Sequence, residues 1–186
     1  ADGVPFSLYH LAPNVPNILA GEYDAYIRWF ARQIKAINKP ILLTLLYEFN
    51  NFGEFSFGNS GLDFYGTIAN DTALYGDPSI PDGPERVRDA FIHVIDIFQQ
   101  EQVSNAGWFM YGNTAYRSPL IFEDATDTVG IPGDMDAWSH PQNYYPGDSY
   151  IDFVGKSLHF STANQMAVYL DNAYEDWGEV TQRPLF

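Results

Sequence analysis

Cysteine, basic residues and long apolar runs are scarce in this sequence. The 186 residues include no cysteine, which excludes disulfide bonds but leaves the compartment open, because large secreted enzymes need none. Lys and Arg together number 9 against 24 Asp and Glu, giving a formal net charge of −15. Such a surface repels phosphate backbones, so we expect no nucleic acid among the partners. No apolar run approaches the roughly 18 residues of a membrane span, so we expect no membrane association.

Aromatic residues, by contrast, are abundant. Phe, Tyr and Trp make up 17% of the chain, with 13 Tyr and 4 Trp. Tyr and Trp combine a flat apolar face with a polar edge, which suits stacking on sugar rings. Composition alone favours the plainer explanation of a large aromatic core. No signal peptide is visible at Ala1, so we expect the sequence to begin as a mature form or as an internal piece.

Hydrophobic periodicity predicts strands that alternate with helices. Apolar residues spaced by three and four predict helices at about 22–37, 84–100 and 162–176. Short apolar runs predict strands at 4–9, 41–47, 106–111, 150–160 and from 183 onward. Loops are expected at 14–21, 51–83 and 112–149. This alternation is typical of an α/β fold with a parallel sheet, and we predict a single domain over residues 1–186.

Glu48 is the candidate that the residues single out by themselves. It directly follows the apolar run at 41–47, and active sites of parallel α/β folds gather at the carboxyl ends of strands. A carboxyl at an apolar mouth is partly desolvated, which raises its pKa and makes it a usable proton donor near neutral pH. A glutamate at the end of a strand can equally cap a helix or pair with an arginine, so position alone leaves both roles open.

Five segments in sequence order carry a resemblance to one known enzyme family. Tyr47-Glu48-Phe49-Asn50 follows an apolar strand as the family's His-Glu-Met-Asn does, with Tyr47 in place of His and Phe49 in place of Met. The other four are a helix with Arg and His at 84–94, Asn-Ala-Gly-Trp-Phe at 105–109, Tyr-Tyr-Pro-Gly-Asp at 144–148 and Ile-Asp-Phe-Val-Gly at 151–155. Together these segments resemble glycoside hydrolase family 26, the β-mannanase type.

The resemblance implies a (β/α)8 TIM barrel that is incomplete in this chain. The strands expected near 4, 41, 106, 150 and 184 would be its third to seventh. Another chain or further segments would then complete the barrel. The implied activity is that of a secreted O-glycosyl hydrolase without cofactor or metal, similar to endo-β-1,4-mannanase, which hydrolyses a β-linked polysaccharide with retention.

In this resemblance Glu48 is the catalytic acid/base. Retention also needs a nucleophilic carboxylate about 5–5.5 Å away. In the family that residue ends the seventh strand, and the corresponding position lies beyond Phe186. Glu54 and Asp148 are other carboxylates of the chain, but neither stands at a matching position.

Aromatic and polar residues near the expected mouth are candidates for contact with sugars. The predicted substrate-binding residues are Tyr9, His10, Asn50, Phe52, Trp138, Tyr145 and His159. Trp138 would stack on a sugar ring, or else pin its loop. Asn50 would orient a sugar hydroxyl or hold Glu48, and His159 would face the nucleophile or sit as a satisfied core histidine.

A second class of function stays open. A non-catalytic barrel, kept for carbohydrate binding or as an assembly-forming structural protein, fits Tyr47 in place of His and the nucleophile that lies beyond the chain. Asn70-Asp71-Thr72 is a glycosylation sequon, meaningful only in a eukaryotic secretory context. Acidic residues near it show no EF-hand spacing, so solvation of the loop is the better interpretation than calcium binding.

Overall fold

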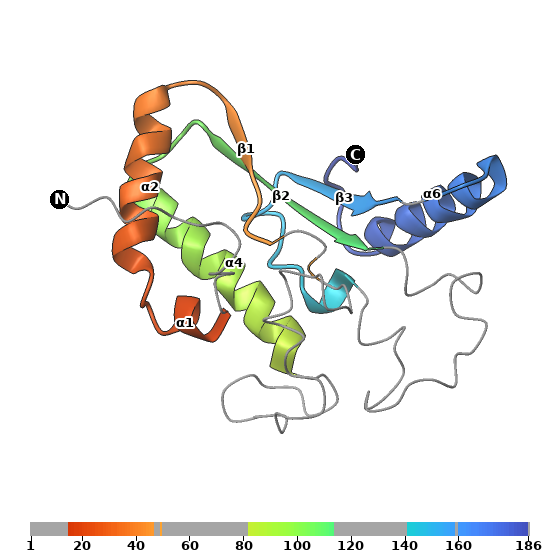
Figure 1. Cartoon of the computed structure of the whole chain (residues 1–186), viewed down its shortest axis with the longest axis horizontal. Helices are drawn as coiled ribbons and strands as arrows, with labels where there is room; N and C mark the ends of the chain where they lie inside the picture. Colours follow the sequence, from red (N-terminus) through yellow and green to blue (C-terminus); the bar gives the residue numbers. More distant parts are fainter. Residues whose placement is uncertain (1–14, 47–48, 50–81, 114–140, 159, 186) are drawn as a thin grey trace.

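The computed structural model describes residues 15–46, 49, 82–113, 141–158 and 160–185, in which helices alternate with parallel strands (Figure 1). In chain order the elements are α1 Val15–Leu19, α2 Asp24–Ile37, β1 Ile41–Leu43, α4 Asp82–Gln100, β2 Ala106–Asn113, the 3-10 helix η3 Pro141–Asn143, β3 Phe153–Ser157 and α6 Ala163–Gly178. The predicted α/β class is consistent with this order. The strand expected at 4–9 and most of both long loops lie outside the described residues.

The sheet has the order β1-β2-β3, and both strand pairs are parallel. The register between β1 and β2 begins with Ile41 opposite Ala106. The register between β2 and β3 ends with Asn113 opposite Ser157. A parallel bridge between Val154 and Leu185 adds a further contact beside β3, where the sequence predicts another strand. Because the strands are parallel, their carboxyl ends meet at one edge. The described residues thus form a three-stranded sheet, and the predicted TIM barrel goes beyond what they show.

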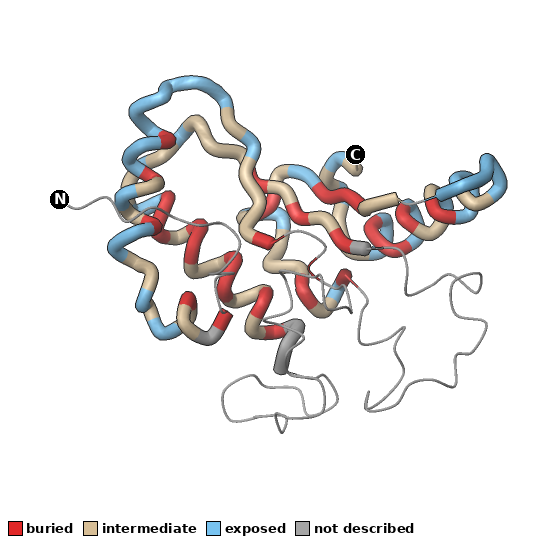
Figure 2. Tube along the Cα trace, in the orientation of Figure 1, coloured by how far each residue is buried: buried red, intermediate tan, exposed pale blue. Residues whose placement is uncertain are grey.

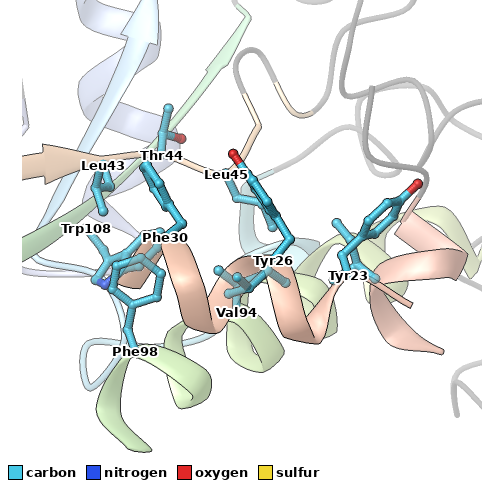
Figure 3. A pocket seen from close by; sticks show the side chains of 11 residues that line it. Tyr23, Tyr26, Phe30, Leu43, Thr44, Leu45, Val94, Phe98 and Trp108 are labelled. Carbon is cyan, nitrogen blue, oxygen red and sulfur yellow. The ribbon is translucent and has the colours of Figure 1, made fainter. Parts of the chain in front are cut away.

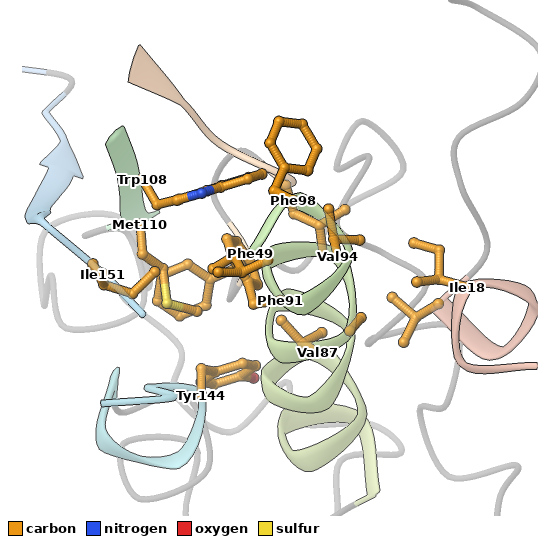
Figure 4. Packing of buried hydrophobic residues seen from close by; sticks show 14 of the residues in the cluster. Ile18, Phe49, Val87, Phe91, Val94, Phe98, Trp108, Met110, Tyr144 and Ile151 are labelled. Atoms are coloured by element: carbon orange, nitrogen blue, oxygen red, sulfur yellow. The ribbon is translucent and has the colours of Figure 1, made fainter. Parts of the chain in front are cut away.

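Helix α4 lies at the centre of the hydrophobic core, and both α1 and α2 pack against it. The apolar stripe that the sequence predicts along this helix is buried, as the tube in Figure 2 shows. Its members are Val87, Ala90, Phe91, Val94, Ile95 and Phe98. Trp108 and Met110 of β2 join the same core (Figure 4), and Trp108 meets Phe98 edge to face at 5.0 Å between ring centroids.

Local capping explains where two of the helices begin and end. Thr162 begins α6 with a capping box: its hydroxyl accepts from the backbone N–H of Gln165, whose side chain accepts from the N–H of Thr162. Asn38 ends α2 in the left-handed conformation with φ 52°, which asparagine tolerates better than most residues. Of the two adjacent hydroxyl residues Ser161 and Thr162, Thr162 is therefore the cap of α6.

The loop predicted at 14–21 is wrong, because α1 forms there. Proline is tolerated in the first turn of a helix, where its missing N–H has no partner within the helix, and Pro16 stands in that turn. Gly21, with φ 77°, then closes the helix: its N–H donates to Ile18 O at 2.9 Å, and that of Glu22 donates to Asn17 O at 3.0 Å. Pro16 and Gly21 thus stand at the start and just past the end of a short helix.

The two faces of the sheet differ. Trp108, Met110 and Val154 are buried on the face that packs against the helices. Strand alternation places Phe109 and Tyr111 on the other face, where their rings stack at 5.5 Å. The strand register puts Leu42 and Phe153 on this second face, and they are 46% and 37% exposed. We call it the open face, defined by Leu42, Phe109, Tyr111 and Phe153.

Candidate functional site

The candidate site is the edge of the sheet where β1, β2 and β3 end. The predicted acid/base Glu48 follows β1 in sequence and lies outside the described residues. The same holds for six of the predicted substrate-binding residues, namely Tyr9, His10, Asn50, Phe52, Trp138 and His159. Their roles stay predictions. The structure does describe Leu46 and Phe49, the described residues nearest to Glu48 in sequence, as well as Tyr145.

Leu46 and Phe49 flank the Tyr47-Glu48 pair, and both side chains are buried, at 3% and 0% exposure. The ring of Phe49 lies 4.8 Å from that of Tyr144, tilted by 52°, and Figure 4 shows both residues beside α4. On its other side Phe49 meets Trp177 edge to face at 6.2 Å. The chain is therefore anchored in the core on both sides of the predicted catalytic residue.

Trp177 is itself held in place by two contacts. Its indole N–H donates to the carbonyl of Gly155 in β3 at 3.0 Å, and its ring meets that of Tyr145 at 5.8 Å. We call Phe49, Tyr144, Tyr145 and Trp177 the aromatic cluster. It joins the residue after Glu48 to the segment at η3, to β3 and to α6. Nothing in the periodicity of the sequence predicts this cluster, because its members come from distant segments.

A buried ion pair lies beneath the carboxyl end of β3. Lys156 of β3 donates to Asp176 of α6, and their side chains are 1% and 0% exposed. Two buried charges are tolerated only together, since removing either leaves the other without compensation in a medium of low dielectric constant. Lys156 shares the helix-covered face with Val154, so it joins β3 to α6. The pair is not predictable from the sequence, where its one signal is a lysine inside the apolar strand Phe-Val-Gly-Lys-Ser.

Tyr145 is the one predicted substrate-binding residue that the structure describes. Its hydroxyl donates to Asp148 Oδ1 at 2.6 Å, and Thr181 donates to the same oxygen at 2.5 Å. Burial, together with the bond to Asp148, raises the pKa of Tyr145 to about 12. The hydrogen bond from Thr181, with that from Tyr145, holds the pKa of Asp148 below its usual value.

Tyr145, Asp148 and Thr181 lie in the two segments that precede β3 and the bridge at Leu185. Asp148 precedes β3 in sequence, and the N–H of Arg183 donates to the hydroxyl of Thr181 at 3.0 Å just before the bridge. Asp148 and Thr181 therefore join the segment before β3 to the segment before the bridge at Leu185. The geometry gives Tyr145 and Asp148 a structural role, and contact of Tyr145 with substrate stays a prediction.

Several other charged residues form polar contacts between α2 and either α4 or Glu101, which follows α4. Glu101 accepts from Arg32 at 2.7 Å and lies 3.4 Å from Arg28, and these contacts lower its pKa. His93 Nε2 lies 2.7 Å from Asp24 Oδ1 at the first turn of α2. His93, on the helix whose Arg and His carry part of the family resemblance, thus joins two helices.

A cavity of about 180 Å³ lies between α2, α4 and β1 (Figure 3). Its lining is apolar apart from Thr44 and the hydroxyls of two tyrosines, Tyr23 and Tyr26, so it offers no catalytic acid. Within the described ranges no three His, Cys, Asp or Glu side chains come close enough together to hold a metal ion. None of the helices that the structure describes is long and apolar enough to cross a membrane.

Comparisons with known proteins give a distant match. No family model matches the sequence. Over 141 residues, 76% of this chain, it is 28% identical to the glycoside hydrolase Endoglucanase H of Acetivibrio thermocellus, and it spans 12% of that protein. A solved Bacillus subtilis mannanase matches 87% of this chain and 46% of its own at 14% identity, with a TM-score of 0.38, too low to carry an argument. The chain thus has weak homology to a glycoside hydrolase, and membership of family 26 stays a prediction.

Proposed function

We propose that this chain is part of a secreted glycoside hydrolase that cleaves within a β-linked polysaccharide with retention, with β-mannan as its preferred substrate. The observation that carries the proposal is the 28% identity to Endoglucanase H over 76% of the chain. The similar protein is an endoglucanase, whereas the sequence resemblance is to the β-mannanase type, so glucan and mannan are both candidate glycans.

The geometry of the described residues supports Glu48 as the acid/base. It follows the first of three parallel strands whose carboxyl ends meet at one edge, the usual place for active sites in α/β folds. Buried Leu46 and Phe49 anchor the chain on both sides of it. A catalytic carboxyl needs such support, because reactions depend on placing the reacting atoms within a fraction of an ångström.

In the proposed reaction Glu48 first donates its proton to the glycosidic oxygen while a second carboxylate attacks the anomeric carbon. The bond to the leaving sugar breaks, and a covalent glycosyl-enzyme forms. Glu48, now ionised, then takes a proton from water, which attacks the same carbon and frees the nucleophile. The family resemblance places the nucleophile after the strand that begins near Pro184, on a barrel that further segments complete.

Residues near the mouth would bind the sugar chain. Trp138 and Phe52 would stack on sugar rings, because a flat aromatic face matches the apolar face of a pyranose. The proposed hydrogen-bonding residues are Tyr9, His10, Asn50 and His159. No cofactor or metal enters this reaction.

The test is the substitution Glu48→Gln in the natural polypeptide that carries these residues. Release of reducing ends is measured on mannan, mixed-linkage glucan and xylan. General acid–base catalysis contributes about 10²–10⁴-fold, and we expect a loss of that size on the preferred glycan. The matched control is Glu22→Gln, an exposed glutamate in the turn before α2, which should keep full activity.

Two outcomes would overturn the proposal. Unchanged turnover in Glu48→Gln would remove this residue from its catalytic role. A wild-type polypeptide that binds one of these glycans but hydrolyses none would instead support the non-catalytic binding barrel. Tyr47, at the position where the resemblance expects His, is the observation that favours this second function.

A further inference from the structure

The cavity between α2, α4 and β1 takes no part in the proposed reaction. We propose that it is a binding site for one small apolar aromatic ring, of about the size of benzene. Figure 3 shows the side chains of 11 described residues that line it. None of these residues is proposed to contact the glycan, so the inference stands independently of the proposed function.

The first argument is the size of the cavity. Its volume is about 180 Å³. In another protein, an apolar cavity of about 150 Å³ that is lined by Leu, Ile and Phe stays free of water and binds benzene. Pockets for drug-sized ligands occupy about 300–1,000 Å³, so this cavity is too small for such ligands. It therefore has room for a single ring with few substituents.

The second argument is the chemistry of the lining. Eight of the 11 side chains are aliphatic or are rings of Phe or Trp, and the others bring the hydroxyls of Tyr23, Tyr26 and Thr44. A pyranose carries several hydroxyl groups, and each one that is buried without a hydrogen-bond partner costs free energy. Benzene has no such group. The lining thus favours an apolar ring over a sugar ring.

The third argument is the arrangement of the aromatic rings, which favours an aromatic ligand. The ring of Phe30 is parallel to that of Tyr26 at 6.3 Å between centroids, and it is inclined by 68° to that of Phe98, also at 6.3 Å. Phe98 in turn meets Trp108 edge to face at 5.0 Å. The lining therefore presents both ring faces and ring edges. An inserted aromatic ring can then make the edge-to-face and offset contacts that aromatic pairs prefer.

The fourth argument is access from solvent. Tyr26 lines the cavity and is 39% exposed, whereas Phe98 and Trp108, which also line it, are buried. The cavity therefore extends from the surface of α2 to the hydrophobic core. Trp29, whose ring lies 5.7 Å from that of Tyr26, is 54% exposed and extends the apolar surface at this entrance. A ligand can enter here without unfolding of the core.

The experiment adds benzene to the natural polypeptide and follows the methyl signals of Ile27 and Val94 by NMR. Both residues line the cavity. We expect these signals to shift in a saturable way with a Kd of about 1 mM or lower, since a ligand of six carbon atoms has limited binding energy. Nuclear Overhauser contacts between benzene protons and these methyl groups should give the place of binding. Mannose at the same concentration should leave both signals unchanged.

Two variants and a matched control connect binding with the cavity. Val94→Phe and Leu45→Phe each add a ring to the lining, and each should weaken benzene binding at least about 10-fold, because the added ring fills the space. Val168→Phe makes the same change as Val94→Phe on α6, where Val168 is 45% exposed. This control should bind benzene as the wild type does.

Several results would overturn the inference. The wild type decides without any variant: no saturable shift, or Overhauser contacts of benzene with other residues only, would exclude this site. Benzene affinity that is unchanged in folded Val94→Phe or Leu45→Phe would place the binding elsewhere. Equal shifts with mannose would show that the lining does not select an apolar ring. Hydrolysis of glycan by the same polypeptide, present or absent, has no bearing on these outcomes.

Discussion

Some residues of this chain bury charged or polar groups away from water. The pair of Lys156 and Asp176 is the clearest case. Both side chains are at most 1% exposed, and each charge depends on the other. A lysine in a strand is ordinarily expected on a solvated face. The sequence does not reveal the pair, because the partner that makes burial possible stands on a helix that follows the strand.

Tyr145 leads to a prediction about alkaline pH. Its folded pKa of about 12 is above the ordinary value of 10.0, mainly because burial disfavours the ionised hydroxyl. Its contribution to stability is fully present below about pH 10 and is lost as the pH rises through the folded pKa. We expect Tyr145→Phe to flatten the loss of stability between about pH 10 and 12, measured as the midpoint of urea unfolding.

The control for this experiment is Tyr174→Phe, because Tyr174 is 64% exposed. That variant should lose stability with rising pH as the wild type does. If Tyr145→Phe follows the same alkaline curve as Tyr174→Phe, the hydroxyl of Tyr145 is not the group that titrates.

The residues of the candidate site differ in whether their roles can be predicted from the sequence. Glu48 stands out because it ends an apolar run in a chain whose pattern predicts parallel strands. Phe49 does not, because its burial depends on Tyr144 and Trp177, which packing brings together from distant segments. Tyr145 is predicted from resemblance alone, and its hydroxyl donates to Asp148, which precedes β3 in sequence.

At the scale of elements, the start of α6 gives a prediction about stability. Thr162 and Gln165 satisfy each other's backbone N–H groups in a capping box. We expect Thr162→Ala to lower the free energy of unfolding by about 1 kcal/mol, a typical value for loss of an N-cap side chain. Thr162→Ser, which keeps the hydroxyl, should lose much less. Equal losses in the two variants, measured by urea unfolding, would show that the hydroxyl does not cap this helix.

The elements were predictable where one face of a segment is apolar. The stripe on α4 predicts its buried residues, and α2 ends at Ile37 as its pattern indicates. Two features were not predictable. α1 forms although Pro16 stands in its first turn, and β1 ends at Leu43 within an apolar run that predicts a longer strand. Apolar composition shows that a segment is buried, but hydrogen bonding with its neighbours decides where a strand ends.

At the scale of the whole molecule, the open face makes the proposed barrel testable. Parallel sheets are normally covered on both faces. Leu42 on this face is 46% exposed among the described residues, and a closed barrel would bury it. In the natural polypeptide we therefore expect Leu42→Asp to cost several kcal/mol, about the penalty for an unpaired charge in a core.

The matched control is Ile37→Asp at the end of α2, since Ile37 is 53% exposed on a helix. A surface substitution usually changes the free energy of unfolding by at most about 0.5 kcal/mol. If Leu42→Asp is as mild as this control, the open face is solvated and the sheet does not close into a barrel.

The central claim is that Glu48 protonates the leaving oxygen. The most direct test compares substrates whose leaving groups differ in their need for that proton. An aryl β-glycoside whose phenol leaves readily needs no protonation, whereas a natural glycan does. In Glu48→Gln we predict a loss of about 10²–10⁴-fold on the glycan but continued release of phenol from the aryl glycoside as the covalent intermediate forms. Equal losses on both substrates, or no loss on the glycan, would contradict the account.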